Sequence, residues 1–237
     1  YRPEGYNVSK TAGYCMIEDG TYFTKEDSSG ALYFDTTDDS EDYLFEWRDI
    51  KTNALISSLT TGAGGKLKIP YVLPASFALG GNVLTIANDS DPNIILCTLK
   101  FVTECSGKYT PIDCDFVNRF GAWQRITFFK ASRLSINASG KDYNLMSANL
   151  DYNTSVGSYQ SLNINGRESI KVNTGLVGEN YASAIRELLL SETILLDGQP
   201  VNVKTKGLDL PSHENVKQIN YSIEFDYAYD LINTLGI

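Results

Sequence analysis

The chain has 237 residues, of which 42% are apolar, so it is long enough for one large domain or two smaller ones with a sizeable core. The 20 Lys and Arg residues against 29 Asp and Glu residues give a net charge of -9, which argues against a general binder of nucleic acid or of anionic membranes. No apolar run approaches the roughly 18 residues that a membrane-spanning helix needs. We therefore expect no nucleic-acid or membrane partner.

Residues 35–42 form the first distinctive segment, because each of them is acidic or carries a hydroxyl group. Such a segment cannot contribute to a hydrophobic core, and a solvated loop is the simplest interpretation. A calcium site is the alternative, since oxygen ligands cluster here, although the spacing lacks the glycine of an EF-hand loop.

The next region, up to residue 104, reads as short strands separated by Gly- and Asn-rich turns, a spacing that predicts a small immunoglobulin-like sandwich. The last strand is apolar on both faces and is therefore predicted to be central and buried. The Gly-rich residues 61–65 could suggest phosphate binding, but they lack the Lys-Ser/Thr and the following helix of a P-loop, which favours a hairpin turn. The predicted strands are 43–48, 55–59, 66–69, 82–87 and 94–102.

A second region begins near residue 106 with a predicted hairpin, in which strands 112–117 and 123–130 flank a turn at 118–121. Residues 135–157 are rich in Asn, Ser and Gly and predict a long loop or arm, a kind of segment that is often functional. Residues 158–172 alternate again, with a hairpin turn predicted at Asn165-Gly166.

An amphipathic helix is predicted over 180–192, because apolar residues recur there at helical spacing and form one stripe. This stripe is expected to pack on a sheet, whereas Leu190 lies off it and is expected to be covered by a neighbouring segment. A hairpin turn at Asp197-Gly198 and a cleanly alternating final strand, 219–227, follow. The stripe consists of Tyr181, Ala184, Ile185, Leu188 and Leu189.

The four cysteines, Cys15, Cys97, Cys105 and Cys114, match no zinc pattern, since the chain has no CxxC and a single histidine. Isolated buried thiols are the preferred interpretation and fit a protein made in a reducing cytoplasm. A bridge from Cys105 to either Cys97 or Cys114 is the alternative.

No catalytic constellation is visible. The single histidine, His213, lies in a predicted loop, and the chain has no G-x-S-x-G motif. We assign no catalytic, cofactor-binding or metal-binding residue, and we expect no cofactor and no small-molecule ligand. A pair of carboxylates for glycoside hydrolysis remains open, as does a glycan-stacking platform among the 15 Tyr, 10 Phe and 2 Trp residues, although β propensity already explains most of these aromatics.

The second region carries a set of motifs that resembles a family of tailed-bacteriophage virion proteins, and the resemblance covers roughly residues 104–237. It rests on a "Y-x-P-I" strand, an "N-R-F-G" turn and a "W-x-x-x-x-F-F-K" strand, followed by a closing "Y-x-x-E-F-x-Y-A-Y". These motifs begin at Tyr109, Asn118, Trp123 and Tyr221. Each element is also a plain structural motif, and the family has no catalytic residues to transfer.

The resemblance implies a non-enzymatic structural subunit of a phage particle, in a tail, baseplate or neck ring. Such a subunit is made in the host cytoplasm, self-assembles and contacts other virion proteins. The expected fold is mainly β, with an immunoglobulin-like sandwich at 1–104 and an assembly domain at 105–237 that combines a β-sheet with one packed α-helix. A carbohydrate-binding or host-adhesion module is the first alternative, and a carbohydrate-active enzyme with a carboxylate pair is the second.

Overall fold

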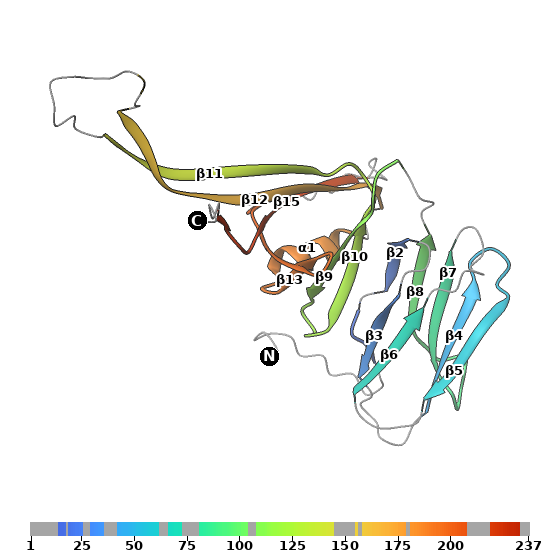
Figure 1. The fold of residues 1–237 in the computed structure, drawn as a ribbon. Helices are drawn as coiled ribbons and strands as arrows, with labels where there is room; N and C mark the ends of the chain where they lie inside the picture. The colour runs from blue at the N-terminus through green and yellow to red at the C-terminus, as the bar shows by residue number, and fades with distance from the viewer. Residues whose placement is uncertain are drawn as a thin grey trace.

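The fold is given by a computed structural model that describes residues 14–17, 19–25, 29–35, 42–61, 66–72, 81–103, 108–144, 155, 158–178, 181–207 and 219–232. Within these residues the protein is mainly β, with three sheets and one α-helix, as the sequence predicts. Figure 1 shows a sandwich at one end, a sheet that carries the helix beside it, and a long two-stranded ribbon that reaches away from both.

The N-terminal part is a β-sandwich of a three-stranded and a five-stranded sheet. The strand orders β1-β3-β6 and β8-β7-β4-β5 match the A-B-E and G-F-C-C′ orders of immunoglobulin domains, and β2 adds to β8 in parallel. The predicted immunoglobulin-like sandwich is therefore confirmed. Its strands are β1 (Tyr14–Cys15), β2 (Gly20–Thr24), β3 (Ser29–Asp35), β4 (Tyr43–Asp49), β5 (Leu55–Thr61), β6 (Lys66–Val72), β7 (Asn82–Asn88) and β8 (Ile95–Thr103).

Aromatic rings hold the two sheets of the sandwich together. Phe34 of β3 packs edge-on against Tyr43 and Phe45 of β4, with ring centroids 4.9 and 5.6 Å apart, and all three side chains are buried. Edge-to-face pairs at this separation add to the free energy gained by burying apolar surface.

The strand predicted as buried on both faces, 94–102, corresponds to β8, and this prediction is wrong in part. β8 lies inside its sheet, between β2 and β7. Only one face of it is buried, through Cys97, Leu99 and Phe101, whereas Lys100 on the other face is exposed. The sandwich has one core, so each of its sheets has a single buried face.

The C-terminal part is an eight-stranded antiparallel sheet in the order β10-β9-β13-β14-β15-β12-β11, with β16 paired to β12. The predicted turns at 118–121 and at Asp197-Gly198 are confirmed, and the latter pair has φ of 45° and 81°, as a tight hairpin requires. The strands are β9 (Ile112–Val117), β10 (Trp123–Phe128), β11 (Arg133–Asn144), β12 (Tyr159–Val177), β13 (Ile194–Leu196), β14 (Gln199–Val203), β15 (Ile219–Tyr227) and β16 (Leu231–Ile232).

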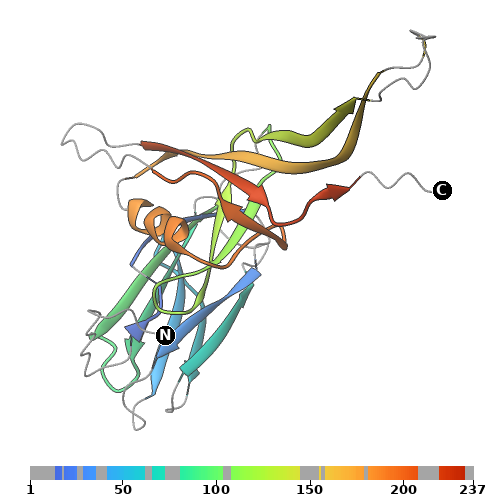
Figure 2. The same ribbon diagram turned by 90° about the vertical axis from the view of Figure 1, so that its left-hand side faces the viewer.

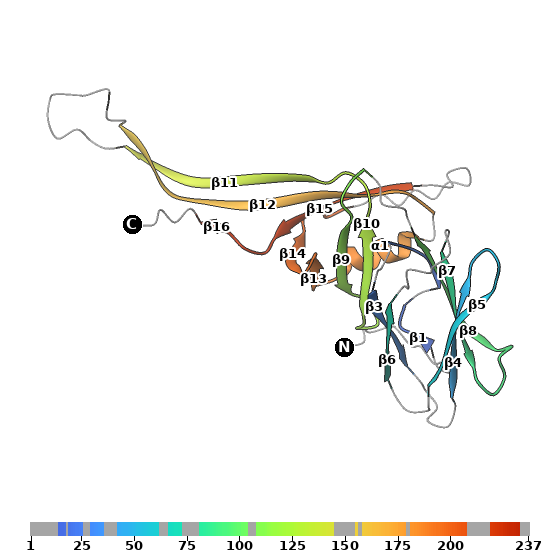
Figure 3. The same ribbon diagram turned by 45° about the vertical axis from the view of Figure 1, so that its right-hand side comes forward.

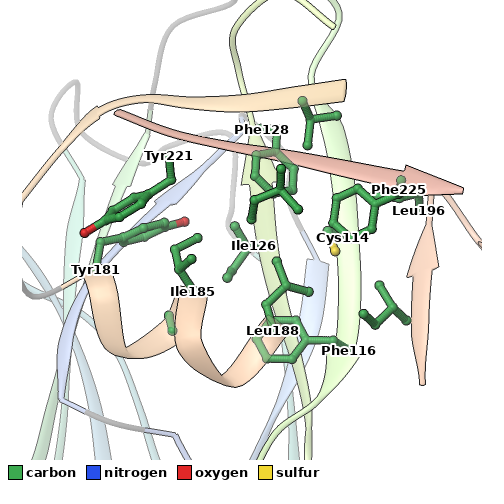
Figure 4. Packing of buried hydrophobic residues seen from close by; sticks show 14 of the residues in the cluster. Cys114, Phe116, Ile126, Phe128, Tyr181, Ile185, Leu188, Leu196, Tyr221 and Phe225 are labelled. Carbon is green, nitrogen blue, oxygen red and sulfur yellow. The ribbon is translucent and has the colours of Figure 1, made fainter. Parts of the chain in front are cut away.

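The single helix, α1 (Ala182–Leu190), buries its predicted stripe in the core of the C-terminal part. Ile185 and Leu188 are fully buried, and Figure 4 shows them pointing toward Ile126 and Phe116 of the β9–β10 hairpin. Figure 2 shows α1 between the sandwich and the strand β15. Leu190 is 76% exposed, so no described segment covers it, contrary to the prediction.

The loop predicted as one form of 135–157 and the turn predicted at Asn165-Gly166 are wrong where the structure describes them. Residues 135–144 belong to β11, and Asn165 and Gly166 lie inside β12, opposite Ser139 and Ala138. Gly166 therefore lies within a paired strand instead of in a turn. A Cβ at this position would lie 3.7 Å from Cγ2 of Ile136 and 3.5 Å from Cβ of Leu231.

Polar and apolar contacts join the sandwich to the C-terminal sheet, and among the latter Met16 packs with Ala122. The Lys25 ammonium lies 2.5 Å from a carboxylate oxygen of Asp113, and the side-chain amide of Asn118 donates a hydrogen bond of 2.7 Å to the carbonyl of Met16. Phe23 and Tyr181 also form a ring contact, with centroids 5.9 Å apart. The main hydrophobic clusters of the two parts are nevertheless separate.

The division into domains 1–104 and 105–237 stays a prediction, and limited proteolysis tests it. We expect a Glu-specific protease to cut first after Glu104 and trypsin to cut first after Lys108, because Ser106-Gly107 is a turn signal between two strand series. Each digest should leave two fragments that withstand further digestion. Initial cleavage elsewhere, with 100–110 intact, would contradict the division.

Candidate assembly surface

The ribbon formed by β11 and β12 is the most prominent feature of the surface. The two strands pair antiparallel from Arg133 opposite Lys171 to Asn144 opposite Tyr159, and Figures 1 and 3 show the far half standing clear of the rest of the protein. A two-stranded ribbon is marginally stable in water unless another surface packs against it. The side chains of the ribbon therefore indicate what kind of surface can pack against it.

One face of the ribbon is mainly apolar and exposed, although Glu168 pairs with Ile136 on this face. Along β11, Leu134 and Ile136 point to the same face as Ile170, their neighbour on β12, which belongs to the buried core. This face therefore continues the core-facing side of the sheet beyond the core. We call its exposed residues the apolar strip: Leu134, Ile136, Ile164 and Leu231, with exposed fractions of 53%, 61%, 53% and 37%.

Contacts around two glycines hold the apolar strip together. A Cβ at Gly140 would lie 3.0 Å from Cγ1 of Ile164, and the close packing of Gly166 against Ile136 and Leu231 lies on the same face. β16, which carries Leu231, pairs with β12 at this point. The strip is thus built from three strands, and it reaches from the edge of the core onto the projecting half of the ribbon.

The opposite face of the ribbon is polar, and its groups bond to one another. The Ser169 hydroxyl donates to Asp226 (2.6 Å), and the Asn137 amide donates to the Ser169 hydroxyl (3.3 Å). The Arg167 guanidinium donates to a carboxylate oxygen of Asp230 at 3.1 Å. The ribbon is therefore amphipathic, with a polar face whose hydrogen bonds are made within the chain and an apolar face that is left in solvent.

A β-bulge interrupts the ribbon between Ser139 and Lys141, where Asn163 adopts a left-handed conformation with φ of 53°. Asparagine tolerates this conformation better than most residues. Bulges bend and twist a ribbon, and the ribbon in Figure 1 curves along its length. Beyond the bulge, Tyr143 donates a hydrogen bond of 2.7 Å to the side chain of Gln160.

The outer edge of β11 is the second unusual feature of the ribbon. β11 ends the strand order of its sheet, and among the described strands it pairs only with β12. Its remaining backbone N–H and C=O groups can pair with a further strand. An edge of 12 residues, from Arg133 to Asn144, is long enough for strand addition by another chain.

A small hollow of about 150 Å³ lies at the base of the ribbon, lined by Phe23, Lys130, Thr174, Leu176 and Val177. The Lys130 side chain crosses Gly175 there, because a Cβ on Gly175 would lie 2.5 Å from its Cε. Gly175 has φ of 77°, and the register between β12 and β15 is irregular at this point. The exposed Leu176 beside the hollow adds a second apolar spot near the ribbon.

Most of the candidate catalytic, phosphate-binding and calcium-binding sites considered in the sequence analysis lie outside the described residues. This holds for His213, for the Gly-rich residues 62–65 and for the centre of the acidic segment, 36–41. Within the described residues, no group of three or more His, Cys, Asp or Glu side chains is placed to hold a metal ion. Cys15, Cys97 and Cys114 are free and buried, so neither bridge to Cys105 forms, while Cys105 itself lies outside the described residues.

Acidic side chains that lie close together are engaged in ion pairs. Asp115 accepts a two-point interaction from Arg125 at 2.6 and 2.7 Å, and Arg125 also lies 3.8 Å from Asp113. Glu224 and Asp226 both contact the Lys204 ammonium, at 2.6 and 3.8 Å. Such pairs are typical of exposed sheet surfaces, where they contribute little to stability.

Glu187 is the acidic residue that burial affects most among those described here. Burial raises the pKa of its carboxyl group above the usual value, and the nearby Arg119 guanidinium, 3.0 Å away, counteracts part of this effect. Glu187 lies on α1 and Arg119 in the turn before β10, so the pair ties the helix to the β9–β10 hairpin.

One local pattern in the sequence does point to the apolar strip. Leu134 and Ile136, like Leu162 and Ile164, repeat at the two-residue spacing of a strand within segments otherwise rich in Asn and Ser. Polar composition alone favoured a loop for 135–157. The positions of Gly166 and Leu231 next to Ile136 depend on long-range pairing, which no local pattern reveals.

Comparison of the sequence with models of known protein families gives no match, and comparison with curated proteins gives none either. The resemblance to phage virion proteins therefore stays a prediction from the motifs. The single described helix is much too short to cross a lipid bilayer.

Proposed function

We propose that this chain is a non-enzymatic structural subunit of a bacteriophage particle, a component of a tail, baseplate or neck ring. It would be made in the host cytoplasm, assemble with further copies of itself in the virion and contact other virion proteins. The observation that carries the assembly part of the proposal is the ribbon with its exposed apolar strip. The motifs that begin at Tyr109, Asn118, Trp123 and Tyr221 support the phage part.

The physical argument starts from the exposed apolar surface. A contiguous apolar surface on a projecting element is unfavourable in water and is typical of a protein–protein interface. The polar face of the ribbon, by contrast, already satisfies its own hydrogen bonds through Ser169, Asp226 and Arg167. The apolar strip of one subunit would therefore face protein, while the polar face stays in water.

A second copy of the chain is the partner that these features favour. Closed symmetry lets one small protein build a large surface, because every copy offers the same contacts. The ribbon reaches well beyond the body of its own subunit, and the free edge of β11 can accept a strand. Both features suit contact between neighbours in a ring, and neither requires a ligand.

Shortening the ribbon tests this proposal. In one variant, residues 136–168 are replaced by Asn-Gly, which removes Ile136 and Ile164 and lets a tight turn join the paired residues Ser135 and Ser169. We expect this variant to be monomeric, with the circular dichroism spectrum of a folded β protein, because the core begins at Ile170. The readout is the mass in solution by light scattering.

A matched variant separates the strip from the tip of the ribbon. Here residues 145–158, which lie beyond the pair Asn144–Tyr159, are replaced by the same turn, so the apolar strip stays in place. We expect this variant to assemble. The proposal is wrong if the full chain and both shortened chains have the same mass in solution.

A further inference from the structure

Two of the buried cysteines of the sandwich lie next to each other. Cys15 is on β1 in the three-stranded sheet and Cys97 is on β8 in the five-stranded sheet, and both side chains belong to the same core. The two strands face each other across the sandwich, with Cα atoms that approach within 8 Å. The sequence predicted isolated thiols, which is correct in that both are free, but these two are neighbours.

The thiols themselves are in contact. The Cys15 thiol points toward the carbonyl of Tyr33, 4.0 Å away, and shares a side-chain hydrogen bond with the Cys97 thiol. This contact and burial raise the pKa of Cys97 above the usual value of a thiol. At neutral pH the Cys97 sulfur is therefore protonated and reacts slowly, although it already lies close to Cys15.

We propose that Cys15 and Cys97 form a latent disulfide site, which closes when the protein moves from a reducing to an oxidising environment. Each sulfur gives up one proton, the S–S bond forms, and two electrons pass to an oxidant such as a diazene, which becomes a hydrazine. The bond links the two sheets at one edge of the sandwich. This inference does not depend on the proposed assembly function.

The bond has a clear structural consequence. It ties the first described strand, β1, to the last strand of the sandwich, β8, so β1 can no longer separate from the core on its own. Closing a long segment of chain restricts the unfolded state and stabilises the folded one, provided that the native geometry accepts the bond without strain. Cys114 lies in the other core, which makes it an internal control.

Trypsin separates all four cysteines, which allows a direct test. Cys15 falls in peptide 11–25, Cys97 in 69–100, Cys105 in 101–108 and Cys114 in 109–119. The full-length folded protein is treated with diamide, remaining thiols are blocked with N-ethylmaleimide after unfolding, and the digest is analysed by mass spectrometry. We expect a linked pair of peptides 11–25 and 69–100, which dithiothreitol separates. The rate of its formation should rise with pH, since the reacting species is the thiolate.

Thermal unfolding gives the second readout. The oxidised protein should melt roughly 5–15 °C higher than the reduced protein, and dithiothreitol should abolish the difference. Cys15→Ser and Cys97→Ser should each lose both the linked peptides and the shift, whereas Cys114→Ser should keep both. The proposal is overturned if Cys15 and Cys97 stay free, if either links to Cys105 or to another molecule, or if oxidation lowers the melting temperature.

Discussion

Replacing Leu188 by alanine is expected to lower the free energy of unfolding by roughly 2–5 kcal/mol. Leu188 is fully buried, and it packs from α1 against the β9–β10 hairpin at the centre of the C-terminal core. The substitution removes apolar contacts and leaves a cavity that the surrounding strands can fill only in part. Chemical denaturation, followed by fluorescence of the two tryptophans and by circular dichroism, measures the change.

The control for this prediction is Leu190→Ala, two residues further along the same helix. Leu190 is exposed, so the same chemical change should shift stability by no more than about 0.5 kcal/mol. Both variants are best compared in the chain with the shortened ribbon, where assembly does not add to stability. Equal effects of the two substitutions would show that the stripe of α1 is not part of the core.

The second large effect is expected on the apolar strip. Ile136→Glu should raise the protein concentration needed for assembly by about 30-fold or more, because a charged side chain would enter an apolar contact without a partner. A loss of about 2 kcal/mol per contact corresponds to such a factor. Sedimentation velocity over a range of concentrations measures it.

Ser139→Glu provides the matched control, since it places the same charge on the same strand but on the polar face of the ribbon. Ser139 pairs with Asn165, on the face opposite Ile136. We expect assembly of this variant to change by less than about threefold, as for most substitutions at the rim of an interface. If the two variants assemble equally well, the apolar strip is not the contact surface.

The parts of the fold that the sequence predicted best are those with a strong local period. The final strand alternates as predicted, with Ile219, Tyr221, Ile223 and Phe225 in the core, and the stripe of α1 lies against the sheet. Each of these elements has one buried face, so burial alone determines the pattern of residue types. The turn at Asp197-Gly198 was equally predictable, because few other dipeptides fit its backbone conformation.

The ribbon was misread because its pairing is not local. Asn165-Gly166 has the composition of a tight turn, yet β12 runs straight through it, held by β11 on one side and β16 on the other. Ile136 and Leu231 lie at ordinary van der Waals distance from where a Cβ on this residue would be, so the pairing of β12, and not a need for glycine, explains its place in the strand. A sequence pattern cannot distinguish these two placements of glycine without knowledge of the strands on either side.

The proposed assembly surface could be predicted only in outline. The sequence placed an arm near 135–157, and the structure adds the free edge of β11 and the apolar strip. The strip collects residues from β11, β12 and β16, which lie up to about a hundred residues apart in the chain. The register of the sheet brings these residues onto one face, and this register cannot be predicted from the local sequence pattern.

The mass of the full-length chain in solution is the most direct test of the central claim, that this protein assembles with itself through the ribbon. Light scattering coupled to size exclusion, over a wide range of concentrations, should show a homomeric species at a multiple of 26.2 kDa, and electron microscopy should show rings or stacks. A single species of 26.2 kDa at every concentration would contradict the account. Binding or cleavage of a glycan by that monomer would then favour the carbohydrate-directed alternatives.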